Sequence, residues 1–139
     1  MSYTYAITVD LSYSQALERT RKALAEQGFG ILTEIDVRAT FQDKLGAEAA
    51  EAVGDYAILG ACNPGLASKA LAAEPQLGAL LPCNVVVRRG AVDTATTVEA
   101  IDPHTMVTLS DSPQVGEVAD DADRRLRAAL EAMANGGRA

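Results

Sequence analysis

Alternating apolar and polar positions open the chain, and the apolar members of this alternation are Tyr3, Tyr5, Ile7 and Val9. A period of two is typical of a half-buried strand. Ser12 then offers a helix N-cap with Gln15 three residues later, and Gly28 is placed to end that helix in a left-handed conformation. An apolar, β-branched run over residues 30–37 predicts a second strand. The start of the chain therefore predicts a strand–helix–strand unit.

The pattern continues with shorter elements. Residues 40–53 predict one or two short helices. Three further strands are predicted, at residues 56–62, 84–88 and 94–101. Asn63 and Pro64 are suited to the cap and first turn of a helix between the first two of these strands. The last helix is predicted from near residue 116 to 134, with residues 135–139 as a flexible tail.

This order of elements predicts the fold class. Strand, helix, strand, short helix, strand, helix, strand, strand, helix is typical of an α+β protein. We expect a two-layer sandwich, with a mixed or antiparallel sheet of about five strands and the helices on one face. The length of 139 residues indicates a single domain over residues 1–139.

Composition and charge exclude several classes of function. An apolar fraction of 48% and a charged fraction of 22% are those of a globular protein. The net charge of −7 argues against binding to nucleic acid, which depends on a basic surface. No apolar run reaches the length of a membrane span, and residues 1–5 lack the pattern of a signal peptide. We therefore expect a cytoplasmic protein with no membrane segment.

Two cysteines stand at corresponding points of the pattern, each followed by asparagine. Cys62 ends a predicted strand just before the helix cap Asn63, and Cys83 precedes Asn84 where the next strand begins. If these strands are neighbours, both sulfurs lie near one end of the sheet. The positive end of the helix dipole lowers the pKa of a nearby thiol, which favours a reactive Cys62. Buried packing of both cysteines is the alternative interpretation.

The helix start itself has two interpretations. Free backbone N–H groups at a helix N-terminus bind anions, and Gly65 would let a ligand approach the main chain. Pro64 removes one of these donors, and a simple cap explains Asn63 and Pro64 completely.

His104 is the only histidine, so any catalytic device that needs an imidazole must use it. Cys62, Cys83, His104 and Met106 together are a plausible set of ligands for a soft metal, although their spacing does not demand one. A histidine in a surface loop is the simpler interpretation. Phosphate-binding loops, nucleophile elbows and zinc-protease motifs are missing from the sequence, so the question of an enzyme and of a cofactor stays open.

Several motifs carry a resemblance to a known family. They are Cys62-Asn63-Pro64, the run Leu80-Leu81-Pro82-Cys83-Asn84-Val85-Val86-Val87, and Ala100-Ile101-Asp102-Pro103. In these stretches the chain resembles the bacterial family catalogued as domain of unknown function 302, from the first strand to about Leu109. The resemblance implies a compact α+β fold that tends to form homodimers. It implies no established activity, substrate or catalytic residue.

Three hypotheses of function follow. The first is a module that binds a small molecule or ion near Cys62, Asn63 and Gly65, with Cys83 and Asn84 alongside. The second is a thiol or redox protein that uses Cys62 and Cys83. The third is a structural or interaction homodimer without a small-molecule site.

Overall fold

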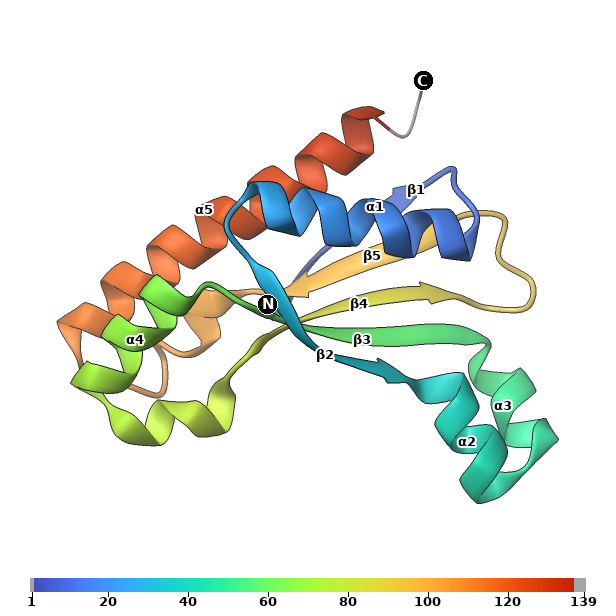
Figure 1. Cartoon of the computed structure of the whole chain (residues 1–139), viewed down its shortest axis with the longest axis horizontal. Helices are drawn as coiled ribbons and strands as arrows, with labels where there is room; N and C mark the ends of the chain where they lie inside the picture. The colour runs from blue at the N-terminus through green and yellow to red at the C-terminus, as the bar shows by residue number, and fades with distance from the viewer. Residues whose placement is uncertain (1, 137–139) are drawn as a thin grey trace.

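The computed structural model describes residues 2–136 (Figure 1). Its strands are β1 (Thr4–Val9), β2 (Gly30–Asp36), β3 (Asp55–Cys62), β4 (Cys83–Arg89) and β5 (Thr96–Ile101). Its α-helices are α1 (Tyr13–Glu26), α2 (Val37–Leu45), α3 (Ala47–Val53), α4 (Pro64–Ala73) and α5 (Pro113–Gly136). Two short 3₁₀ segments are η1 (Pro75–Leu80) and η2 (Pro103–Thr105). Across the described residues, no helix is both long and apolar enough to cross a membrane.

The five strands form one sheet in the order β1-β5-β4-β3-β2, and every neighbouring pair is antiparallel. The predicted α+β class is therefore confirmed, and of the two predicted sheet types the antiparallel one is correct. The first two strands lie at opposite edges, so three later strands separate the halves of the strand–helix–strand unit that opens the chain.

The long helices α1 and α5 lie on one face of the sheet, while α2 and α3 extend beyond one end and α4 lies at the other (Figure 1). Alternate residues of the strands face α1 and α5, and those of β5 show the pattern most clearly. Thr96, Val98 and Ala100 are each at most 1% exposed. Val98 and Ala100 pack in one cluster with Leu24 of α1 and Leu126 of α5. The hydroxyl of Thr96 donates to the carbonyl of Leu11. The core is thus the layer between the sheet and these two helices.

Local signals in the sequence explain the boundaries of α1. The Ser12 hydroxyl accepts from the N–H of Gln15 at 3.2 Å, and the Gln15 side chain accepts from the N–H of Ser12 at 3.2 Å. The predicted capping box is therefore confirmed. Gly28 has a φ of +86°, the left-handed conformation predicted after the helix.

Several predicted boundaries are wrong, such as the start of β5, which lies at Thr96 instead of residue 94, and two of the errors have a local cause. Strand β2 ends at Asp36 instead of residue 37, because the Asp36 carboxylate accepts from the N–H of Ala39 at 2.9 Å and starts α2. The last helix begins at Pro113, since proline is tolerated in a first turn, and it continues to Gly136. The first two residues of the expected tail, 135 and 136, are thus helical, and residues 137–139 lie outside the described part of the chain.

Candidate functional site

The register of the sheet brings the two cysteines to the same end of it. On β3 and β4, Ala61 pairs with Cys83, and Cys62 is the next residue along β3, where it pairs with Gly30 of β2. Strands 56–62 and 84–88 are therefore neighbours, which is the condition under which both sulfurs are expected near one end of the sheet. Both thiols are half-buried and free.

A cavity of about 260 Å³ lies at this end of the sheet, and both cysteines line it. Helix α4 contributes Leu66, Ala67 and Ala70 to its wall. Leu81 and Pro82 of the segment before β4 contribute a second side. Apart from Asn63 and the two thiols, the lining side chains in the described chain are hydrocarbon, thioether or glycine. The site is therefore an apolar cavity with two sulfurs at one end.

Distant residues complete this cavity. Met106, which follows η2, and Val118 and Ala122 of α5 line it as well. All three are at most 7% exposed and belong to one hydrophobic cluster with Leu66 and Ala70 of α4. Sequence patterns indicate Met106 only as a metal ligand and indicate no residue of α5 for the site. The apolar period of α5 is the one signal that marks Val118 and Ala122, and it indicates burial without indicating against what.

Two local features position the cysteine end of the cavity. The Asn63 side chain accepts from the N–H of Leu66 at 3.1 Å, so the predicted N-cap of α4 is confirmed. Gly60 lies opposite Thr33 in the register of β2 and β3. A Cβ on Gly60 would collide with the Thr33 side chain and come within 2.8 Å of Pro82 Cγ. The glycine therefore allows Pro82 to lie against β3.

The thiol of Cys83 stays protonated at neutral pH. Burial raises the pKa of Cys83 to about 11, and the neighbouring Cys62 adds to this rise. Removing the proton would leave a charged sulfur in surroundings of low polarity, where a charge is costly. Cys83 therefore acts here as a polarisable, uncharged group.

The structure does not bring all predicted site residues together. Cys62, Asn63, Cys83 and Met106 line the cavity, whereas Gly65, Asn84 and His104 do not. Asn84 is exposed. His104 lies in η2, where its ring contacts carboxylates of Asp102 and Asp120. The proposed soft-metal set thus retains its three sulfur residues around one cavity, without the histidine.

A second, larger hollow of about 590 Å³ shares Leu66 and Val118 with the cavity. Its lining includes the charged residues Lys69, Glu117 and Asp121. Arg125 donates to Asp121 at 2.8 Å and lowers the pKa of that carboxyl. This hollow is a charged surface groove between α4 and α5, and the predicted cysteine residues do not line it.

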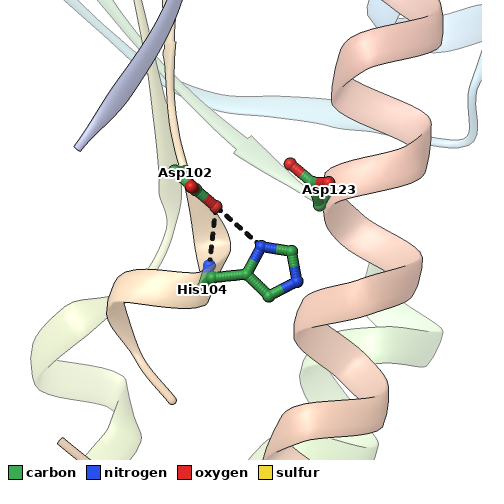
Figure 2. A group of neighbouring side chains, drawn as sticks. All are labelled: Asp102, His104 and Asp123. Carbon is green, nitrogen blue, oxygen red and sulfur yellow. Dashed lines mark hydrogen bonds and ion pairs between the residues drawn. The ribbon is translucent and has the colours of Figure 1, made fainter. Parts of the chain in front are cut away.

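A group of titratable side chains lies between η2 and α5 (Figure 2). Ligand-type atoms of Asp102, His104 and Asp123 lie within 4.8 Å of one another, a spacing found in metal sites. Both ring nitrogens of His104, however, already contact carboxylate oxygens, and a nitrogen that carries a proton offers no lone pair to a metal. The group is therefore a hydrogen-bonded ion cluster.

Comparisons with known proteins agree with this architecture. A crystal structure of an uncharacterized conserved protein DUF302 from Bacillus stearothermophilus superposes with a TM-score of 0.83 at 27% sequence identity. The match covers 96% of this chain and 99% of that one. No curated protein matches the chain. The family model described as "Domain of unknown function DUF302" matches residues 5–133. Since this match spans nearly the whole sequence, the chain belongs to the DUF302 family.

Proposed function

We propose that this domain binds a small, largely apolar molecule in the cavity between α4, β3, β4 and α5. The observation that carries the proposal is the cavity itself, about 260 Å³ in volume and lined almost entirely by apolar side chains. A smaller engineered apolar cavity, of about 150 Å³, stays dry and binds benzene. The volume here suits a substituted aromatic ring or a short branched chain.

The polar groups of the cavity are few, which supports a ligand that is mostly apolar. Asn63 uses its side-chain oxygen to cap α4, and its amide nitrogen lies beside Gly28, so this residue offers little polar surface to the cavity. The uncharged thiol of Cys83 lies near the same end. A few placed polar groups in an apolar cavity are typical of sites that orient small molecules.

The thiol or redox hypothesis has weaker support from this geometry. Thiol–disulfide exchange needs a thiolate, and a pKa of about 11 leaves Cys83 almost entirely protonated at pH 7. Ligand binding requires no ionisation of either cysteine. The raised pKa of Cys83 is therefore compatible with a binding site, and it is unfavourable for Cys83 as the attacking thiol of a redox pair.

Saturation-transfer NMR with toluene and indole tests the proposal on the full chain. We expect both probes to bind at millimolar or lower concentration, and Ala67→Leu, which places three carbons in the cavity, to weaken binding. Ala25→Leu makes the same change on the exposed side of α1, where it lines neither hollow, and is the matched control. Failure of both probes to bind, or equal binding to Ala67→Leu, would contradict the proposal.

We propose second that the open face of the sheet pairs with another copy of this chain. Ile35, Ile58 and Val86 form a row across three strands on the face away from α1 and α5, and Ile35 is 48% exposed. Glu99 lies next to Val86 in the register and pairs with Arg88 at 3.2 Å. A two-fold axis places identical patches together, so this apolar row would pack against the same row of a second copy.

Light scattering tests this second proposal. The monomer mass is 14.5 kDa, and we expect twice that value for the natural chain at micromolar concentration. Val86→Lys should give the monomer mass with an unchanged circular dichroism spectrum. Val92→Lys, in an exposed loop, is the control and should leave the dimer intact. A monomer mass for the natural chain would overturn the proposal.

A further inference from the structure

The ring of His104 bridges two segments that are distant in sequence. Its Nδ1 lies 2.9 Å from the carboxylate of Asp102, at the start of η2, and its Nε2 lies 2.7 Å from the carboxylate of Asp120 on α5. Figure 2 shows the ring in the gap between η2 and α5, with Asp123 facing it from the helix. A neutral imidazole has one N–H, so only the protonated ring can donate to both carboxylates.

The charges around the ring favour that protonated form. The hydrogen bond with Asp120 is the main cause that raises the pKa of His104; burial opposes this rise as the next largest effect, and Asp102 and Asp123 add to the rise. One cation already faces the cluster, because Arg127 donates to Asp123 at 3.0 Å. Until His104 gains its proton, Arg127 pairs with Asp123, whereas Asp102 and Asp120 have no cationic partner among the described residues. Loss of that proton places a lone pair against one of the two carboxylates.

Both segments that His104 joins contribute to the apolar cavity. Met106 follows His104 by two residues, is 4% exposed, and lines the cavity. Val118 and Ala122, on either side of Asp120 in α5, line the same cavity and pack in one cluster with Met106. The contact between His104 and Asp120 therefore lies across the junction between two walls of the cavity.

We propose that His104, when protonated, links η2 to α5 through hydrogen bonds and thereby tightens the cavity around its ligand. This inference rests on the proposed function, because it assigns the regulation of that same site. As pH rises and the ring becomes neutral, the link between η2 and α5 weakens, and the wall that contains Met106 loosens from α5. The affinity for an apolar ligand then falls. Because Asp120 is 73% exposed, the effect is of the modest size of surface ion pairs, about two- to fivefold in affinity.

NMR reports each step of this proposal on the full chain treated with a chelator. His104 is the only histidine, so its ring protons titrate without overlap. We expect a His104 pKa above 6.5, and Asp120→Asn should lower it. Glu117→Gln removes an exposed carboxylate from the same helix as Asp120 and is the matched control. It should leave the pKa of His104 unchanged. The methyl group of Met106 reports on the cavity wall and should shift with the same midpoint.

Indole binding between pH 5.5 and 9 supplies the functional readout. We expect the natural chain to lose two- to fivefold in affinity across the midpoint measured for His104, and Asp120→Asn to show a flat profile. Indole that binds with constant affinity while His104 titrates would overturn the proposal. If no indole binds at any pH, the proposed function fails. A Met106 methyl signal that does not shift with pH would then contradict the proposed link between η2 and α5 as well. A His104 ring signal that responds only to added Zn²⁺, and not to pH, would identify a metal site in place of the proposed link.

Discussion

Filling the apolar cavity should stabilise this protein, and Ala67→Leu is the substitution that tests it. Ala67 is a residue of α4 whose side chain faces the cavity. Leucine has nearly the helix propensity of alanine, so the change leaves the helix itself almost unaffected. The new side chain adds three carbons to a space of about 260 Å³. A space of about 150 Å³ accommodates the six carbons of benzene, so the added carbons fit without overpacking.

The magnitude follows from burial. Each buried methylene contributes about 0.8 kcal/mol, which gives about 2.4 kcal/mol for three carbons. Fixing the leucine rotamer costs about 0.5–1 kcal/mol. The free energy of unfolding should therefore rise by about 1.5–2 kcal/mol. For a chain of this length, that increase corresponds to a rise in melting temperature of about 5 °C.

Urea unfolding followed by circular dichroism measures the effect. Ala25→Leu makes the same chemical change at an exposed position of α1 that lines neither hollow, and it should alter the free energy of unfolding by less than about 0.5 kcal/mol. A stability of Ala67→Leu equal to or below that of the natural chain would refute the reasoning, because it would mean that the cavity has no room for three carbons. An equal gain for both variants would show that helix propensity, and not cavity filling, is the cause.

Three further predictions concern single positions. Cys83→Ser should lower the free energy of unfolding by about 1–3 kcal/mol, because a hydroxyl replaces a thiol in apolar surroundings. In the natural chain, Cys83 should react with iodoacetamide only as pH approaches about 11, because only the thiolate reacts. Gly60→Ala should lower the free energy of unfolding by about 1–3 kcal/mol, because the new Cβ collides with Thr33. Gly116→Ala, in an open position of α5, should raise it by about 0.5–1 kcal/mol. Chemical unfolding of both variants measures the two changes. His104 has a raised pKa in the folded state, so its contribution to stability is complete below pH 6.5 and is lost as pH rises through the folded-state pKa. Since its side chain is 43% exposed, this loss should stay below about 1 kcal/mol, and His104→Gln should show no such dependence in unfolding at several pH values.

Local chemistry in the sequence accounts for much of this fold. The strand period of the first residues, the capping box of Ser12, the left-handed Gly28 and the cap Asn63 each act within a few residues, so the sequence alone identifies them. The same reasoning locates Cys62 and Cys83 at the ends of two strands. Their proximity required only that these strands be neighbours, which is the commonest arrangement of consecutive strands.

The start of helix α2 shows where local reasoning was insufficient. The prediction of one or two short helices over residues 40–53 is confirmed by α2 and α3, but α2 begins earlier, at Val37. None of its residues is buried, so no apolar period marks where it begins. The Asp36 cap defines its start, and an aspartate that follows an apolar run is equally compatible with a turn.

The cavity and the His104 cluster were decided by tertiary structure alone. Met106 and Val118 come together because α5 crosses the end of the sheet and packs on both α4 and η2, and no local pattern encodes that crossing. Asp120 lies 16 residues after His104, and each residue by itself has the pattern of a solvated surface side chain. Periodicity along a chain records which side chains are buried, whereas their partners depend on contacts between distant segments. The sequence therefore determined the elements and the position of the cysteines, and the packing of α5 determined the cavity that they line.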